Sequence, residues 1–418
     1  MSRVWRLILY VLALLLTMAA AAVIGWFAMP QVATVSNTPP LFYILSLAVV
    51  VCVILAGSFL FGRVLRQKTS AILVSSTALS ALLAFAGWQI LFQPAHRLLG
   101  MPPPASINTD ASVDYWTLPT GSRIAYRHFA SRKPKQATII WLHGGPGAYA
   151  VEMRALHIMH RALADAGYDL YVYDQIGSGL SARLDDPRAY TLERHLEDLS
   201  AIQHQVGAQQ AVLVGSSWGA TLAAHYISKH PGRVSAAIFN APGEIVPFKI
   251  EQNTERSLAE SDRKAKEANQ LAIGPRFLLM RDIRLRNPAL FNQLSSDAEW
   301  DAVMDHDLNK FDLKRGFCDN DTGDFSVTGY GLFSHNFTYL DFQSNADDPR
   351  EKLREYPLPV LLMRGECEFL GDAIVAQYRE SFPDLKYLNV PGAGHFITLE
   401  QPGAFVSNVD AFLTDKIE

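Results

Sequence analysis

The feature that most constrains this chain is a serine placed in a tight turn between a strand-like run and a helix-like run. Residues 212–214 are Val-Leu-Val, and they lead into Gly215-Ser216-Ser217-Trp218-Gly219, after which alanine and leucine become frequent. A strand that turns sharply into a helix strains the backbone of its central residue, and glycines on either side remove clashes that a Cβ would cause. Only Ser217 lies midway between the glycines, so Ser217, and not Ser216, is the candidate nucleophile.

Short strand-like runs alternate with helix-like runs on both sides of this serine. The helix-like runs are 152–166, 191–206, 372–382 and 402–414, together with the stretch that ends at 230. The strand-like runs are Val113–Leu118, Arg123–Phe129, Ala137–Leu142, Asp169–Tyr173, Ala211–Val214, Ser235–Phe239, Val360–Met363 and Lys386–Val390. This alternation predicts an α/β fold with a mostly parallel, eight-stranded sheet and helices on both faces.

The alternation stops between about residues 244 and 356. This segment is richer in charged and aromatic residues, and its clearest helix-like stretches are Gln252–Gln270 and Pro275–Arg286. An insertion of this size between two strands of a sheet is typical of a lid over an active site. We therefore expect a core made of residues 113–243 and 357–418, with residues 244–356 as a helical cap.

A serine nucleophile needs a base and an acid, which in this type of sheet follow it on the turns after later strands. The turn after Lys386–Val390 reads Pro-Gly-Ala-Gly-His, which makes His395 the candidate base. The turn after Val360–Met363 offers three carboxylates. Glu368 lies three residues past a glycine, where the acid is expected, and Asp372 is the alternative, although it could instead cap the next helix. Glu366 is expected to be a solvated turn residue.

The tetrahedral intermediate of acyl transfer needs hydrogen-bond donors for its oxyanion, usually two backbone N–H groups. One is expected from Trp218, the residue after the nucleophile. The other is expected from the loop after Ala137–Leu142, which reads His143-Gly144-Gly145-Pro146-Gly147. In that loop Gly145 is the favoured donor and Gly144 the second choice.

Three motifs together resemble those of the proline iminopeptidase family of α/β-hydrolases. They are His143-Gly144-Gly145-Pro146-Gly147, Asp174-Gln175-Ile176-Gly177-Ser178-Gly179 and Gly215-Ser216-Ser217-Trp218-Gly219. The resemblance covers about residues 113–416 and implies an α/β-hydrolase fold with a helical cap, Ser217 as nucleophile, His395 as base, and Trp218 with Gly145 at the oxyanion hole. Two positions depart from the family pattern: Ile176 replaces an arginine, and Glu368 replaces an aspartate.

These residues predict a serine hydrolase that works through an acyl-enzyme and requires neither a metal nor a cofactor. The resemblance favours an aminopeptidase of the proline iminopeptidase type, and a carboxylesterase or lipase-like hydrolase of acyl esters is the alternative. A noncatalytic receptor on the same fold is a third interpretation, which the complete order of serine, acid and histidine disfavours.

The expected substrate is a small molecule or a short peptide. An aminopeptidase would bind the substrate's amino group with cap carboxylates, for which the candidates are Glu244, Glu251, Glu255, Asp282 and Glu299.

The first 95 residues are almost free of charge and contain three apolar runs, at about 7–29, 41–62 and 70–92. Each run exceeds the roughly 20 residues that cross a bilayer, so we expect a lipid-embedded anchor of three transmembrane helices. A Pro-rich linker, residues 96–112, joins the anchor to the rest.

Cations lie before the first run and between the second and third, which predicts a cytoplasmic amino terminus. Three crossings then place the catalytic part outside the cytoplasm, and we expect a multi-pass protein of the bacterial inner membrane. If the third run does not cross, the catalytic part is cytoplasmic.

Composition narrows the remaining possibilities. The formal net charge of −4 provides no basic surface for nucleic acid. The three cysteines lack the spacing of a zinc site. Cys318 and Cys367 could pair in an exported domain, but two lone cysteines are more often buried thiols.

Overall fold

The computed structural model describes residues 2–98, 113–133, 136–248, 274–319, 321–323 and 325–417. The chain divides into two compact units, one formed by Met1–Pro102 with Gln270–Glu299 and the other by Pro103–Asn269 with Trp300–Glu418. Most of the expected linker and the expected helix Gln252–Gln270 lie outside the described residues.

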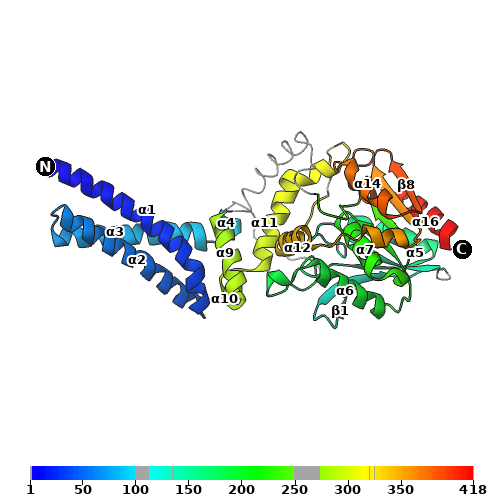
Figure 1. Ribbon diagram of the computed structural model, residues 1–418, viewed down its shortest axis with the longest axis horizontal. Helices are drawn as coiled ribbons and strands as arrows, with labels where there is room; N and C mark the ends of the chain where they lie inside the picture. The colour runs from blue at the N-terminus through cyan, green and yellow to red at the C-terminus, as the bar shows by residue number, and fades with distance from the viewer. Residues whose placement is uncertain are drawn as a thin grey trace. The chain divides into compact units, whose positions relative to one another are not determined.

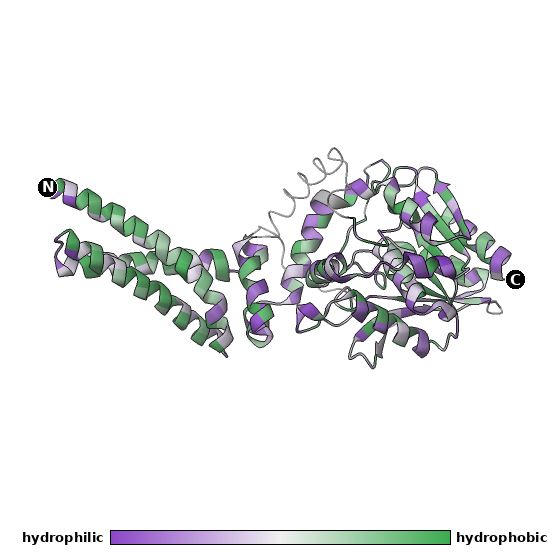
Figure 2. Ribbon diagram, viewed as in Figure 1, coloured by the Kyte–Doolittle hydropathy of each residue, from purple (hydrophilic) through white to green (hydrophobic). Residues whose placement is uncertain are grey.

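The N-terminal unit is built on three long helices, α1 (Arg3–Val35), α2 (Pro39–Val64) and α3 (Thr69–Gly87), and α3 continues as a π-helical turn, Trp88–Phe92 (Figure 1). Each helix is long and apolar enough to cross a membrane. Figure 2 shows that they are hydrophobic along most of their length. Each of the three predicted apolar runs falls within one of these helices.

Small residues allow the three helices to approach one another closely, as is usual in membrane helix bundles. A Cβ on Gly57 of α2 would lie only 2.6 Å from the side chain of Thr17 on α1, and a Cβ on Gly62 would lie 2.5 Å from Ile72 on α3. A hydrogen bond of 2.9 Å between the hydroxyls of Tyr10 and Ser75 also joins α1 to α3.

Part of the insertion belongs to this unit and satisfies carbonyl groups at its helix ends. The last carbonyls of a helix have no partner within the helix. Asn287, between α9 (Pro275–Arg286) and α10 (Pro288–Leu294), donates from Nδ2 to the carbonyls of Ala33 and Ser36, at 3.0 Å each. Arg276 donates to the carbonyl of Leu91 at 2.8 Å, and its Nε donates to Glu299 at 2.7 Å.

The second unit contains one eight-stranded sheet. Its strands are β1 (Asp114–Thr117), β2 (Arg123–Phe129), β3 (Ala137–Leu142), β4 (Tyr168–Tyr173), β5 (Ala211–Ser216), β6 (Val234–Asn240), β7 (Val360–Gly365) and β8 (Leu385–Val390). The spatial order is β1-β2-β4-β3-β5-β6-β7-β8. β2 runs antiparallel to β1 and β4, and the other pairs are parallel. The predicted eight-stranded, mostly parallel sheet is therefore confirmed.

Two groups of helices pack against this sheet. The first is α5 (His157–Ala166) with α16 (Pro402–Ile417), and the second consists of α6 (Leu192–Gln205), α7 (Trp218–Lys229), α13 (Arg350–Glu355) and α14 (Asp372–Ser381). Helix α7 is buried over nearly its whole length, because it packs on the central strands and also on α6 and α13. Parallel strands buried in this way need continuous apolar runs, which explains the sequence pattern.

The described part of residues 244–356 is helical or irregular and contains no strand. In the second unit its helical elements are the end of α11 (Asp297–Asp307), a π-helical turn (Leu308–Asp312), a short 3-10 turn (Leu313–Gly316), α12 (Leu332–Asn345) and α13. One expected helix differs: the run from Glu152 begins as a 3-10 turn, Arg154–Leu156, and becomes α-helical only at His157.

Candidate active site

Ser217 occupies the turn between β5 and α7 in a strained backbone conformation, with φ 51° and ψ −119°. Positive φ is uncommon for a residue with a side chain and is found mainly where the surroundings enforce it. The flanking glycines show how tight the turn is. A Cβ on Gly219 would lie 2.1 Å from the carbonyl oxygen of Leu142, and a Cβ on Gly215 would lie 2.5 Å from the carbonyl oxygen of Gly219. The turn therefore requires glycine at both positions.

Backbone hydrogen bonds hold the strained residue in place. The N–H of Ser217 donates to the carbonyl of Asn240 at 3.1 Å, and its carbonyl accepts from Ala220 and Gly243 at 2.9 Å each. The neighbouring Ser216 has a different role, since its hydroxyl accepts a hydrogen bond of 3.0 Å from the side-chain amide of Asn240.

His395 and Glu368 come together from the turns after β8 and β7. Nδ1 of His395 lies 2.9 Å from Oε2 and 3.0 Å from Oε1 of Glu368. Both side chains are largely buried, with 11% and 3% of their surface exposed. Burial alone would raise the pKa of Glu368. The charge and hydrogen bond of His395, with the N–H of Leu370, outweigh burial and lower that pKa. The acid is therefore ionised at neutral pH.

The other two carboxylates of this turn lie elsewhere. Asp372 begins α14, is exposed and pairs with the guanidinium of Arg364. Glu366 is exposed and accepts from the N–H of Gly392 at 3.0 Å. The structure thus brings Glu368, and neither alternative, to the histidine.

The expected oxyanion donors lie on the two segments next to the serine. Gly144 lies against the nucleophile, since a Cβ there would be 3.1 Å from Cβ of Ser217. Gly145 has a φ of +115° and lines the same cavity as Ser217, Gly144 and His395. Trp218 is the first residue of α7, where backbone N–H groups have no partner within the helix and the helix dipole favours negative charge.

A buried network joins the two segments that carry the expected oxyanion donors, and Gln175 and the side chain of His143 are its additional members. Gln175 donates from Nε2 to the carbonyl of His143 at 3.0 Å, and its Oε1 accepts from Nε1 of Trp218 at 3.1 Å. Nε2 of His143 accepts from the backbone N–H of Gln175 at 2.8 Å, and Nδ1 is 2.8 Å from the carbonyl of Gly144. Burial lowers the pKa of His143 to about 4, so this imidazole is neutral. The sequence signal for this network is the Asp174–Gly179 motif, in which Gln175 follows a buried aspartate.

Asp174 orders the next stretch of the same loop. Its carboxylate is fully buried and accepts from the N–H groups of Ala150 at 2.7 Å, Val151 at 2.9 Å and Leu180 at 2.9 Å. Burial raises the pKa of Asp174, against the effect of these three donors. Ile176, where the family has arginine, is buried, so this position contributes packing and no ion pair.

A cavity of about 420 Å³ contains the hydroxyl-bearing turn and the histidine. Within the described residues its lining is mainly apolar, and Arg315 is its one permanently charged side chain. The insertion, residues 244–356, supplies much of this wall, with Met304, Leu308, Leu313, Phe325, Val327 and Tyr330. None of the described lining residues is a carboxylate.

The carboxylates considered for amine binding are engaged away from this lining. Glu299 pairs with Arg276, and Asp282 pairs with Arg281. Glu244 accepts from Nε2 of Gln343 at 2.7 Å, and burial raises its pKa. Glu251 and Glu255 lie outside the described residues.

A disulfide joins Cys318 to Cys367, so these residues are not the free thiols that lone cysteines usually are. Cys367 directly precedes Glu368. Cys318 is two residues after Gly316, whose carbonyl accepts from the N–H of His395 at 2.7 Å. The bridge therefore connects the two segments that hold the acid and the base. Across the part of the chain that the structure describes, no three His, Cys, Asp or Glu side chains cluster as metal ligands would.

The fold and the arrangement of these residues define an α/β-hydrolase, and residues 137–402 match the family described as alpha/beta hydrolase fold. The chain is 34% identical over 302 residues to a proline iminopeptidase of Heyndrickxia coagulans. The aligned region covers 70% of this chain and 96% of that relative. A proline iminopeptidase of Lacticaseibacillus rhamnosus is 24% identical over 283 residues, covering 65% of this chain and 88% of the relative. The chain thus belongs to the proline iminopeptidase family of α/β-hydrolases, as the motifs predict.

Solved structures agree on the fold. A thermophilic esterase from Thermogutta terrifontis superimposes with a TM-score of 0.50 at 16% identity, over 74% of this chain and 100% of that chain. At this identity the likeness concerns the fold alone.

Proposed function

We propose that this protein is a membrane-anchored serine hydrolase that works through an acyl-enzyme. Oγ of Ser217 attacks the substrate carbonyl carbon and passes its proton to Nε2 of His395, while Glu368 holds the N–H at Nδ1. The carbonyl oxygen becomes an oxyanion that the N–H groups of Trp218 and Gly145, or Gly144, stabilise. The intermediate then expels the leaving group, which takes the proton from His395.

A water molecule completes the cycle. It attacks the acyl-enzyme carbonyl as His395 removes its proton, and the proton returns to Oγ of Ser217 when the acid product leaves. The observation that carries this proposal is the 2.9 Å contact between His395 and Glu368 beside a cavity that also contains the strained Ser217. A receptor that had lost catalysis would have no need for a strained serine beside an oriented imidazole.

For the substrate, the geometry favours esters with an apolar acyl group. The described cavity wall is mainly hydrophobic, with one arginine, Arg315, and no carboxylate to bind a substrate ammonium group. Arg315 lies over the ring of Phe369, with Cζ 5.1 Å from the ring centre. An ammonium group there would meet a like charge, whereas an apolar or anionic group would not.

Aminopeptidase activity is the second candidate, and family membership supports it. The relative with 34% identity over 96% of its length is a proline iminopeptidase. If this activity exists, we infer that the amine-binding carboxylate comes from outside the described wall, where Glu251 and Glu255 are candidates.

We further propose that the N-terminal helices span the membrane and that the catalytic unit lies outside the cytoplasm. Arg3 and Arg6 precede α1, and Arg63, Arg66 and Lys68 lie between α2 and α3. By the positive-inside rule both positions face the cytoplasm. The disulfide supports the same sidedness, because such bonds persist mainly in oxidising compartments.

A fluorophosphonate probe tests the mechanism on the full-length protein in detergent. We expect covalent labelling of the wild type, none of Ser217→Ala, and normal labelling of Ser216→Ala, the matched control on the same turn. Absence of labelling in a folded wild-type protein would refute the enzyme proposal. Prolyl-anilide compared with short and long acyl esters then separates the two substrate classes.

A further inference from the structure

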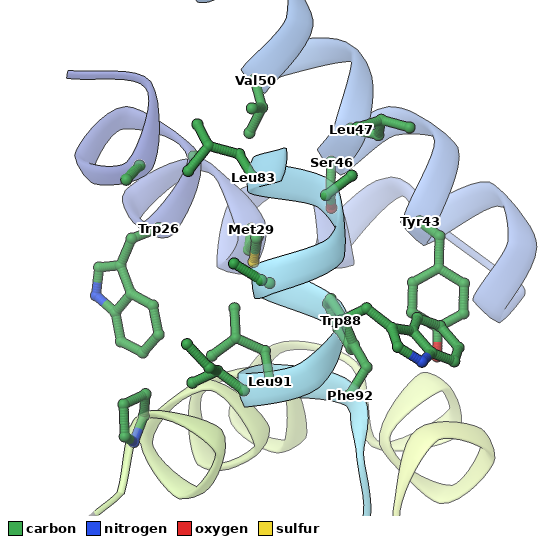
Figure 3. A pocket seen from close by; sticks show the side chains of 17 residues that line it. Trp26, Met29, Tyr43, Ser46, Leu47, Val50, Leu83, Trp88, Leu91 and Phe92 are labelled. Carbon is green, nitrogen blue, oxygen red and sulfur yellow. The ribbon is translucent and has the colours of Figure 1, made fainter. Parts of the chain in front are cut away.

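A second cavity lies inside the N-terminal unit, among α1, α2 and α3. Its volume is about 450 Å³, which is within the range of about 300–1,000 Å³ that is usual for ligand pockets. Figure 3 shows its apolar walls, to which Met29, Leu47, Val50, Leu83 and Leu91 contribute. None of the described lining residues carries a charge.

The cavity lies at one end of the helix bundle. Its lining comes from residues 22–29 of α1, 43–50 of α2 and 83–92 of α3 and its π-helical turn, with Pro275 of α9. These segments are at the opposite helix ends from the cations of the amino terminus and of the loop after α2. In the proposed orientation they lie in the outer half of the bilayer, where Trp26, Tyr43 and Trp88 fit the aromatic belt.

One buried side-chain polar atom in the described wall has no partner. Ser46 is 5% exposed, and its Oγ makes no hydrogen bond with any described residue. Hydroxyls in helices usually donate to the carbonyl four residues earlier, as those of Thr17 and Ser76 do here at 2.8 Å each. A buried hydroxyl without a partner is destabilising, so a ligand that accepts its hydrogen bond would gain affinity. Figure 3 shows the Ser46 oxygen among the lining side chains.

We propose that this cavity binds one acyl chain of a membrane phospholipid, whose ester carbonyl accepts a hydrogen bond from Oγ of Ser46. The apolar walls match a hydrocarbon chain, and the uncharged lining leaves the headgroup at the surface. Ser46 lies seven residues into α2, about 10 Å from its outer end at 1.5 Å per residue. That depth is close to where the ester groups meet the hydrocarbon. The inference rests on the proposed membrane anchoring and not on the hydrolase activity.

The test uses the full-length protein in bilayer nanodiscs containing a phosphatidylethanolamine with a photoactivatable acyl chain. Gly87 lines the cavity, and a Cβ there would have nothing within 4 Å, so Gly87→Leu projects into open space. In the wild type we expect photo-adducts on residues 22–29 and 83–92. The amount of adduct should be about tenfold lower in Gly87→Leu and unchanged in the matched control Gly87→Ala. Equal labelling of both variants would refute the site.

A second pair of variants tests the hydrogen bond without filling the cavity. Ser58 is also buried on α2 with an unpartnered hydroxyl, but it does not line the cavity. We expect Ser46→Ala to weaken binding of the lipid probe about five- to tenfold and Ser58→Ala to leave it unchanged. Equal affinities would refute the ester contact. Release of the full chain from membranes by alkaline carbonate would refute the anchor itself, whereas membrane-retained protein with unaltered labelling refutes only the lipid site.

Discussion

Both carboxylate oxygens of Glu368 lie within hydrogen-bonding distance of Nδ1 of His395, at 2.9 and 3.0 Å. This contact keeps the proton on Nδ1 and leaves Nε2 free to accept the serine proton. It also shows that the longer side chain can fill the position where the family has aspartate.

Glu368→Gln should therefore retain the fold but lose most activity, because an amide can stabilise the wrong tautomer and cannot stabilise the imidazolium. By analogy with other triads, kcat/KM should fall about 10³- to 10⁴-fold. Hydrolysis of the best ester substrate measures this effect. Asp372→Asn serves as the control and should remain within about twofold of the wild type, because Asp372 pairs with Arg364 at the surface. Equal losses in both variants would contradict the assignment of the acid.

Gln175 is predicted to position the oxyanion hole without touching the substrate. Its side chain bridges His143 and Trp218, at 3.0 and 3.1 Å. Gln175→Leu removes both contacts, so kcat should fall about 10- to 100-fold while KM and the pH profile change little. Ile176→Val, at the adjacent buried position, should leave kcat within about twofold. A loss in Gln175→Leu expressed only as a higher KM would argue against this role.

The sequence predicted the sheet well because its central strands are buried on both faces and read as short apolar runs. Arg123–Phe129 and Ala137–Leu142 matched, five other strands are longer than predicted by one or two residues, and β1 is shorter by one residue at each end. The spacing of glycines around Ser217, and the turns that carry His395 and Glu368, follow from the same topology. Such local patterns predict which loops leave one edge of a parallel sheet.

The features that could not be predicted from the sequence are side-chain contacts and a disulfide between segments far apart in the chain. Nothing near Asn287 indicates that its side chain would donate to carbonyls at the end of α1. In the same way, Cys318 and Cys367 are separated by 49 positions, and only the fold brings their Cα atoms to 5.0 Å. Gln175 also looked like an ordinary loop residue, because its partners come from two other turns.

Asp305 should make stability depend on pH in the acid range. Burial raises its pKa to about 6, although it accepts N–H bonds from Gly329 and Tyr330. Between about pH 4 and 6 the folded protein holds this proton and the unfolded chain does not, so this carboxyl lowers the free energy of unfolding as pH rises. The contribution is about 2 to 3 kcal/mol across that window.

Asp305→Asn isolates this effect from the other titrating groups. The free energy of unfolding of the wild type should fall relative to that of the variant as pH rises from 4 to 7, because only the wild type has a carboxyl that titrates at this position. Thermal inactivation midpoints of the full-length protein in detergent, taken over this range, measure the gap between wild type and variant. A constant gap would show that Asp305 does not titrate there.

The disulfide between Cys318 and Cys367 is the last feature with a direct test. It links two positions that are 49 residues apart, one directly before Glu368 and the other two residues after Gly316. Replacing both cysteines with serine should lower the free energy of unfolding by about 2–4 kcal/mol. Because Gly316 accepts the backbone N–H of His395, kcat should also fall. The wild type treated with dithiothreitol should then match the double variant, and the variant itself should not respond to dithiothreitol.

Cys52→Ser is the control, because Cys52 is free and lies on α2. If dithiothreitol slowed the wild type and the double variant equally, the disulfide would have no part in holding the site. Free thiols at Cys318 and Cys367, in membranes isolated under acid quench, would argue against an extracytoplasmic catalytic unit.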